Sequence, residues 1–457
     1  MTAKVVASVL PTFLVLTHAQ AQLAVKFERF SLPNGLEVIL HEDHSVPVVS
    51  CNMWYHVGSA NEKPGRTGFA HLFEHVMFEG SGHVPVGMFD EWLEAAGGQN
   101  NASTSADRTN YWENVPSNAL ELALFLESDR AAHLIDAMTP AKLDAQRDVV
   151  KNERRESYEN QPYGMASILL DENIYPPDHP YHWPTIGSME DLTAASFDDV
   201  VEFFRKYYVP NNASLAIAGD IDPARTKALV QEWFSDVPRG KPVPPLGIPP
   251  ASITQEKRLV HEDKVQLPRL YISWITPRHF APGDAELDVL SNILTGSKNA
   301  RLFKRLVYDL QIAQDVSSGQ ESSFLGSKFS IVVTARAGHT LAELEEVVRE
   351  ELQRIKDEPP TLREVQRAVN GFEANFLDRL EQIGGFGGKA DQLNAYFTET
   401  GNPDYFNEDL SRYRALSPED IRNAARTFLR DDGNVVLSIV PEGKRDLAAP
   451  ARQGGVK

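Results

Sequence analysis

The chain of 457 residues is too long for one hydrophobic core, so its length favours two or more domains. A hydrophobic content of 42% and a charged content of 24% are those of an ordinary globular protein and exclude a largely disordered chain. The formal net charge of −19 at pH 7 argues against nucleic acid and anionic membrane surfaces as partners.

The first 21 residues have the pattern of a cleaved secretory signal. Lys4 precedes an apolar stretch from Val5 to Leu16, and small residues in an A-x-A arrangement follow at Ala19 and Ala21. The apolar stretch is much shorter than the roughly 20 residues that a membrane span needs. We therefore expect cleavage near Ala21 and an exported, periplasmic protein without a membrane anchor. A hydrophobic start on a cytoplasmic protein is the alternative.

Strands and helices are mixed irregularly in the first domain, which we place at residues 22–236. Strand-like runs at 35–43 and 47–57 precede a helical run at 85–98, and strand character returns at 101–115. This mixture predicts an α+β domain with helices on one face of a mostly antiparallel sheet. The single cysteine, Cys51, lies in an apolar strand run, where a buried thiol is expected rather than a nucleophile.

A proline-rich segment at residues 237–256, VPRGKPVPPLGIPPASITQE, divides the chain. Its prolines disfavour both helix and central strand, so we expect an extended linker. On its two sides RKYYVPNNASLAIAGDIDP resembles RTFLRDDGNVVLSIVPEG, and VPVVSCNMWYHVGSA resembles LPRLYISWITPRHFA. This internal similarity predicts that a second domain at residues 257–445 repeats the fold of the first. A flexible tail is expected at residues 446–457.

A short helix is expected around the run HLFEH. Thr67 is a good N-cap and Gly80 a good C′ residue for such a helix. Between them an apolar stripe recurs at helical spacing and should face the core. The stripe consists of Phe69, Leu72, Phe73 and Val76.

His71, Glu74 and His75 lie on a common flank beside that stripe, since positions three and four apart are neighbours on a helix. Two imidazoles one turn apart can bind one zinc ion, and Glu74 is placed to take the proton of a catalytic water. This is the H-x-x-E-H order of the inverzincins. An ordinary helix with a solvated face is the alternative.

A third candidate ligand lies on a later helix. Thr139 and Pro140 provide an N-cap and a first helical position. Glu153 on this helix shares a face with Val149 and Val150, and a carboxylate on an apolar stripe needs a partner. A buried ion pair with an arginine is the alternative to metal binding.

Two further motifs are interpreted as structural. His41 and His44 in HEDH are expected in a polar turn rather than in a second metal site. The run GGFGGK at residues 384–389 lacks a preceding strand and the spacing of a phosphate-binding loop, so it predicts an interruption between helices.

The run VGSANEKPGRTGFAHLFEHVMFEG resembles the zinc-site segment of the pitrilysin family of metallopeptidases, which includes mitochondrial processing peptidase. The run RDVVKNE resembles the helix that carries the family's third ligand. The resemblance implies one Zn2+ per chain, with His71, His75 and Glu153 as ligands and Glu74 as the general base.

The run NNASTSADRTNYWENV is similar to the family's edge strand, which pairs with the main chain of the substrate. Asn101 and Ala102 match the positions that face the scissile bond, so the resemblance implies that they bind substrate. Without the zinc motif, an ordinary strand with solvated serines and threonines would be preferred.

The chain departs from the family pattern at three positions. Gln146 stands where members often carry an additional glutamate near the zinc site. Val307 and Gln314 stand where complete enzymes carry an arginine and a tyrosine that stabilise the substrate oxyanion. We hypothesise that the chain is the zinc-bearing subunit of a heterodimer, in which a partner of similar fold supplies Arg and Tyr. A homodimer is the alternative.

The activity that the resemblance implies is that of a zinc-dependent endopeptidase. It would hydrolyse short or unfolded peptides in an enclosed chamber between two such subunits. A non-catalytic, zinc-containing subunit with a structural or peptide-binding role is the alternative, and the intact set of three ligands and Glu74 argues against it.

Overall fold

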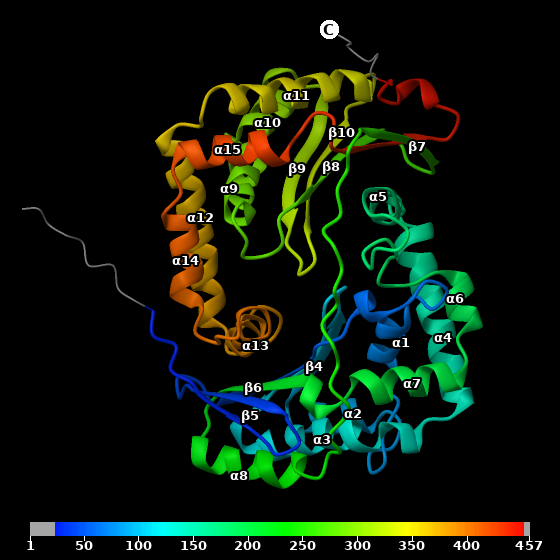
Figure 1. Ribbon diagram of the computed structural model, residues 1–457, viewed down its shortest axis with the longest axis vertical. Helices are drawn as coiled ribbons and strands as arrows, with labels where there is room; N and C mark the ends of the chain where they lie inside the picture. Colours follow the sequence, from blue (N-terminus) through cyan, green and yellow to red (C-terminus); the bar gives the residue numbers. More distant parts are fainter. Residues whose placement is uncertain (1–22, 452–457) are drawn as a thin grey trace, which may run out of the picture.

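The computed structural model describes residues 23–451 and contains two α+β domains joined by an extended linker (Figure 1). The signal segment expected at residues 1–21 lies outside the described residues. No helix in the described part of the chain has the length and apolar character required to cross a membrane. Cys51 is buried in a strand of the first domain, as its apolar context predicts.

The N-terminal domain is built on a six-stranded sheet with the order β1-β2-β6-β3-β5-β4. All neighbours are antiparallel except β2 and β6, which run parallel. Strand β4 therefore forms one edge of the sheet. The strands are β1 (Glu28–Ser31), β2 (Glu37–Glu42), β3 (Val48–Tyr55), β4 (Gln99–Thr104), β5 (Thr109–Pro116) and β6 (Ala213–Gly219).

Helices of the same domain pack on one face of this sheet and enclose the first hydrophobic core. Buried side chains of α1, α3, α7 and α8 contribute to that core. A π-helical turn at Arg155–Glu159 follows α4 directly. The helices are α1 (Phe69–Val76), α2 (Met88–Ala95), α3 (Leu120–Ala137), α4 (Pro140–Arg154), α5 (Ala166–Ile174), α6 (Met189–Ala194), α7 (Phe197–Tyr207) and α8 (Pro223–Phe234).

The C-terminal domain repeats this topology, which confirms the internal similarity seen in the sequence. Its sheet has the order β7-β11-β8-β10-β9, and its one parallel pair is β7 with β11. Strands β8 and β11 thus take the places of β3 and β6, and the edge strand β9 takes the place of β4. The strands are β7 (Lys257–Asp263), β8 (Arg269–Thr276), β9 (Ala313–Glu321), β10 (Ser327–Ala335) and β11 (Val435–Pro441).

Helices α9, α11 and α15 of the C-terminal domain enclose a second core against one face of its sheet. The GGFGGK run connects α12 to α13, as predicted. The helices are α9 (Asp284–Thr295), α10 (Arg301–Phe303), α11 (Leu341–Asp357), α12 (Leu362–Glu381), α13 (Lys389–Thr400), α14 (Phe406–Arg414) and α15 (Pro418–Phe428).

The second face of each sheet is covered by a helix from the other domain (Figure 1). Leu170 and Ile174 of α5 join a cluster with Leu437 and Ile439 of the C-terminal sheet. In return, α13 packs with Ala390 and Leu393 against a cluster on the N-terminal sheet that includes Ile39, Ala216 and Ala218. Each domain's own helices therefore cover one face of its sheet, as predicted, whereas the second face is covered by α5 or α13 from the other domain. These two helices join the domains into one body.

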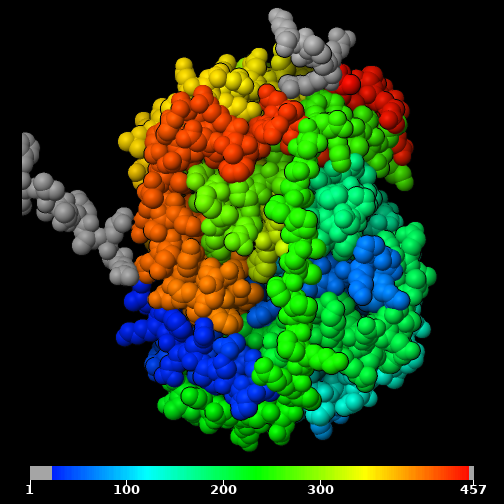
Figure 2. All heavy atoms as spheres, viewed as in Figure 1, coloured from blue at the N-terminus to red at the C-terminus, as the bar shows by residue number. Residues whose placement is uncertain are grey.

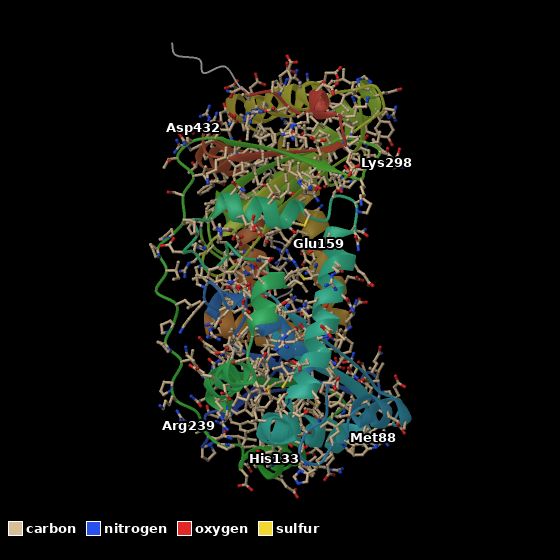
Figure 3. All side chains as sticks on the ribbon, turned by 90° about the vertical axis from the view of Figure 1, so that its right-hand side faces the viewer. Met88, His133, Glu159, Arg239, Lys298 and Asp432 are labelled. Atoms are coloured by element: carbon tan, nitrogen blue, oxygen red, sulfur yellow. The ribbon has the colours of Figure 1, made fainter. Side chains whose placement is uncertain are left out.

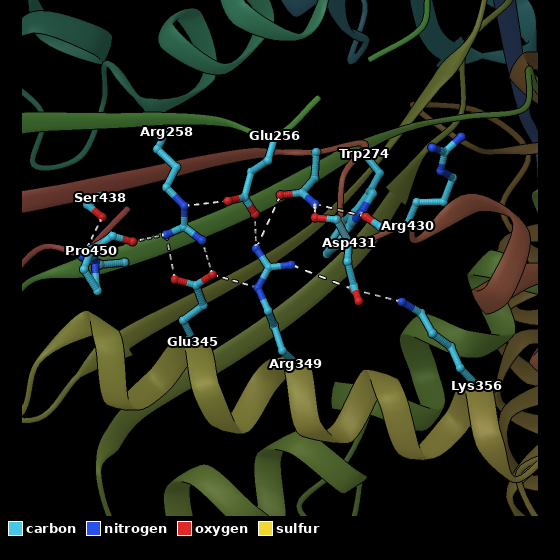
Figure 4. Close-up of polar contacts among 12 residues, drawn as sticks. Glu256, Arg258, Trp274, Glu345, Arg349, Lys356, Arg430, Asp431, Ser438 and Pro450 are labelled. Atoms are coloured by element: carbon cyan, nitrogen blue, oxygen red, sulfur yellow. Dashed lines mark hydrogen bonds and ion pairs between the residues drawn. The ribbon is translucent and has the colours of Figure 1, made fainter. Parts of the chain in front are cut away.

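The linker, residues 237–256, forms neither helix nor strand. It lies as a ridge across the front of the molecule in Figure 2, and in Figure 3 it follows one side from Arg239 towards Asp432. A network of ion pairs fastens its end to α11 (Figure 4). Glu256 pairs with Arg258 and Arg349 at 2.6 Å each, and both arginines also pair with Glu345.

The C-terminal end remains packed beyond the predicted domain boundary. A short 3-10 helix spans Arg445–Leu447, and Ala449 is buried with its N–H donating to Ser438 Oγ at 3.2 Å. The expected flexible tail is therefore wrong for residues 447–449, because the apolar side chains of Leu447, Ala448 and Ala449 contact the second core.

Candidate active site

Helix α1 carries the two candidate histidines, and its start differs from the prediction. Gly68, in the left-handed region with φ 88°, occupies the N-cap position, whereas the Thr67 hydroxyl donates to Asp191 at 2.6 Å. The buried carboxylate of Glu62 accepts hydrogen bonds from the N–H groups of Gly68 and Ala70 at 2.9 and 2.7 Å. The predicted stripe is buried, so the flank with the histidines faces away from the core. The stripe residues are Phe69, Leu72, Phe73 and Val76.

Helix α4 carries the third candidate ligand and begins as predicted. Thr139 caps it and Pro140 is its first residue. Glu153 lies in the last turn, directly before the π-helical turn, and such turns are frequent at functional sites. The predicted apolar stripe is only half present, because Val150 is buried while Val149 is 45% exposed.

The structure brings His71, His75 and Glu153 together. Oε2 of Glu153 lies 3.3 Å from Nε2 of His75 and 3.7 Å from Nε2 of His71. Ligand atoms around a tetrahedral zinc, with bonds of about 2.0–2.1 Å, lie roughly 3.3–3.4 Å apart. The three side chains thus fit one ion after small adjustments. In the described part of the chain Glu153 pairs with these two histidines and does not form the ion pair with an arginine that was the alternative to metal binding.

The charge states of the cluster suit a cation. Burial, reinforced by the neighbouring His75, lowers the pKa of His71 to about 4, so its imidazole is neutral. The hydrogen bond with His75 holds the pKa of Glu153 below its ordinary value, so this carboxylate is ionised. A neutral imidazole and a carboxylate are the forms that bind zinc.

Glu74 points from α1 towards the edge strand β4. The Thr104 hydroxyl donates to Oε2 of Glu74 at 2.5 Å. Burial raises the pKa of Glu74, and the hydrogen bond from Thr104 opposes this shift. A carboxylate with a raised pKa is suited to accept a proton near neutral pH. The sequence prediction missed Thr104, although it follows Ala102 by two positions and such positions share one face of a strand.

Strand β4 leaves main-chain groups open at the sheet edge. Ser105 N–H donates to the carbonyl of Arg108 at 2.8 Å, and hydrogen-bonded pairs alternate along an antiparallel ladder. The pair of Ala102 and Tyr111 is consequently not hydrogen-bonded, and the N–H and C=O of Ala102 face the open edge. The Oδ1 atom of exposed Asn101 accepts the Ala102 N–H at 2.7 Å.

The positions that depart from the family pattern have ordinary surroundings. Gln146 donates to Oε1 of Glu79 at 2.6 Å. Val307 lies in a π-helical turn (Lys304–Asp309) and packs against the second core, while Gln314 is exposed on β9. Neither residue offers the cation or the phenol that would stabilise an oxyanion.

Residues 37–175 match the family model described as Insulinase (Peptidase family M16), and residues 194–372 match the model described as Peptidase M16 inactive domain. The chain is 27% identical to the zinc protease PqqE of Helicobacter pylori, over 93% of this chain and 95% of that protein.

Solved structures agree with these matches. A protease from Helicobacter pylori superposes with a TM-score of 0.85 at 25% identity, covering 92% of this chain and all of that one (100%). The periplasmic protease PqqL from Escherichia coli has the same fold, with a TM-score of 0.76 at 18% identity, and the match covers 92% of this chain and 48% of PqqL.

These likenesses and the duplicated α+β architecture define the class as two-domain peptidases. Within that class the chain belongs to peptidase family M16, the insulinase or pitrilysin family, as the zinc-site segment and the third-ligand helix predicted.

Proposed function

We propose that the protein is a zinc-dependent endopeptidase of the H-x-x-E-H type, with one Zn2+ held by His71, His75 and Glu153. The observation that carries the proposal is the convergence of these ligand atoms from α1 and α4 beside Glu74. A bound zinc would supply a Lewis acid that polarises the scissile carbonyl.

The side chains around the site have separate tasks in this proposal. Glu74 accepts the proton of the attacking water and passes it to the leaving nitrogen. Thr104 holds the Glu74 carboxylate by its hydrogen bond and so fixes the direction of proton transfer. Asn101 and Ala102 bind the substrate main chain, with the Asn101 amide releasing the Ala102 N–H as a peptide strand pairs with the edge.

The substrates are short or unfolded peptides. Pairing along β4 requires an extended main chain with unpaired N–H and C=O groups, which most of the main chain in a folded protein does not offer. Main-chain hydrogen bonds tolerate many side chains, so the edge favours a broad range of sequences.

A partner subunit completes the site. Val307 and Gln314 supply neither the guanidinium nor the phenol of the family pattern, and the chain spans about half of PqqL. Both observations are explained by a pitrilysin-like partner of similar fold. This partner supplies Arg and Tyr and encloses a chamber together with this chain. A homodimer is the alternative assembly. The amino-terminal signal pattern supports export to the periplasm, and the name of PqqL states the same compartment for that protein.

The deciding experiment compares zinc content and hydrolysis of a quenched fluorescent peptide between the native chain, in the presence of its partner, and Glu74→Gln. Zinc in both with hydrolysis only by the native chain is expected, because the ligands remain and the base is lost. Equal hydrolysis by both would overturn the role of Glu74. Zinc in both without hydrolysis by either would favour a non-catalytic, peptide-binding subunit.

A further inference from the structure

A second cluster of metal-ligating side chains lies between helix α3 and the loop that follows α1. His83 stands in that loop, and Asp129 and His133 stand one turn apart on α3. One ligand atom from each lies within 4.8 Å of the other two. Figure 3 labels His133 near the lower end of the molecule. The cluster shares no residue with the candidate zinc ligands.

Asp129 is held as an oriented anionic ligand. Its side chain is 3% exposed, and its Oδ2 atom accepts hydrogen bonds from the Ser81 hydroxyl and from the His83 N–H. Oδ1 is hydrogen-bonded to Nδ1 of His83 at 2.6 Å, and a metal bound between these two atoms would take the place of the bridging proton. Donors on one oxygen orient the other towards an ion.

His133 is oriented in a similar way. Its Nδ1 lies 3.4 Å from Oδ2 of Asp136, which leaves Nε2 as the ligand atom. The rings of His83 and His133 lie 5.2 Å apart and nearly perpendicular. A Cβ atom on Gly82 would lie 2.7 Å from Cβ of His133, so only glycine lets the loop approach the helix this closely.

His44 shows what an ordinary surface histidine looks like in this protein. Its Nδ1 lies 2.6 Å from Asp220 and its Nε2 lies 2.8 Å from Glu42, so both nitrogens are occupied by carboxylates. His44 lies in the predicted polar turn, whereas His41 belongs to strand β2 and its Nδ1 bonds to the carbonyl of Lys26. Within residues 23–451, neither forms a metal-ligating cluster with a second imidazole.

We propose that His83, Asp129 and His133 form a second binding site, for a borderline divalent transition metal such as Zn2+. Two imidazoles with one carboxylate favour zinc, nickel or copper over magnesium and calcium, which prefer oxygen ligands. The half-exposed imidazoles open to solvent and leave a coordination position for water. A metal here ties the segment that follows α1 to α3, so it stabilises the fold. The inference is independent of the peptidase function.

The test uses the tag-free chain, equilibrium dialysis against Zn2+ and metal analysis. The native chain should hold about two equivalents and His133→Ala about one. The double variant His71→Ala/His75→Ala lacks the first site, so it should also hold about one equivalent of zinc. Adding His133→Ala to this double variant should remove that remaining equivalent. His44→Ala is the matched control and should hold as much as the native chain. Equal zinc in the native chain and His133→Ala would overturn the inference.

Two further measurements keep the test decisive if one variant folds poorly. In the His71→Ala/His75→Ala chain, added zinc should raise the melting temperature, because zinc binds the folded state at the second site. This rise should vanish when His83→Ala is added. The His83 side chain is exposed, so its truncation should not disturb the fold. Gly82→Ala retains all three ligands but displaces His133, so the affinity of the second site should fall about 10- to 100-fold. An undiminished melting shift in the His83 variant would contradict the site.

Discussion

Thr104 donates a hydrogen bond to Glu74 across the gap between an edge strand and a helix, with 2.5 Å between Oγ1 and Oε2. The same strand leaves the N–H and C=O of Ala102 at the open edge. One strand therefore both orients the proposed base and offers the main chain on which a peptide would lie. This relationship sets the distance between the base and a bound peptide.

Replacement of Thr104 by valine keeps the shape of the side chain and removes the hydroxyl. A hydrogen bond to a charged group contributes about 1.5–3 kcal/mol, so kcat is expected to fall about tenfold or more while KM and zinc content change little. Thr104→Ser keeps the donor and should retain most of the activity. Steady-state kinetics with a fluorescent peptide checks this, and an equal loss in both variants would show that the methyl group matters instead.

Replacement of Glu153 by glutamine should release zinc from the first site. The amide lacks the charge that pairs with His71 and His75, and loss of even an outer-shell partner costs 10- to 100-fold in metal affinity, so a fall of at least about 100-fold is expected. Glu156→Gln, an exposed change three residues further along, is the matched control. Competition with a zinc chelator measures both, and equal affinities would exclude Glu153 as a ligand.

Replacement of Asp391 by alanine should weaken the contact between the domains. Oδ1 of Asp391, on α13, accepts hydrogen bonds from Trp54 Nε1 and Asn110 Nδ2 at 3.0 Å each, and from Asn52 at 3.4 Å. These donors belong to buried residues of the N-terminal sheet, so leaving them unpaired should cost about 2–4 kcal/mol of stability. Urea unfolding checks this. Asp378→Ala, exposed on α12, should change the midpoint little.

Replacement of Asp288 by asparagine should change how stability depends on pH. Burial raises the pKa of Asp288 from its ordinary 3.8 to about 7, with Tyr413 donating a hydrogen bond at 2.7 Å. The stability that this protonated carboxyl contributes is complete below its unfolded pKa and is lost as the pH rises through about 7.

Because asparagine stays neutral, the melting temperature of Asp288→Asn should rise relative to the native chain between about pH 5 and about pH 8. Calorimetry at the two pH values measures the difference. The exposed change Asp378→Asn should give a constant difference. Parallel behaviour of the Asp288 variant and the native chain would show that Asp288 is ionised throughout.

The chain purified alone should bind zinc and hydrolyse an unfolded peptide poorly, because Val307 and Gln314 do not supply the arginine and tyrosine expected to stabilise the oxyanion. Loss of one such donor costs about 100- to 1,000-fold in kcat, so co-purification with an Arg- and Tyr-bearing partner should raise kcat by a factor of this order. Full activity of a pure homodimer would overturn the heterodimer.

Local sequence patterns predicted many of the helices and strands of this protein and the part of its candidate site that lies on one helix. His71, Glu74 and His75 lie within about one helical turn, so helix periodicity alone places them on one flank. The similarity between the halves also predicted that β8 and β11 would take the places of β3 and β6, because each strand keeps its own turn signals and burial pattern.

Contacts between distant segments were decided only by the tertiary structure. Thr67 has the signal of an N-cap, but Asp191 takes its hydroxyl and Glu62 satisfies the helix start instead. Thr104 reaches Glu74, and α5 and α13 cross between domains, because packing of the two cores sets their positions. Sequence periodicity carries the direction of a side chain within its own helix or strand. It carries no information on which distant surface that side chain will meet.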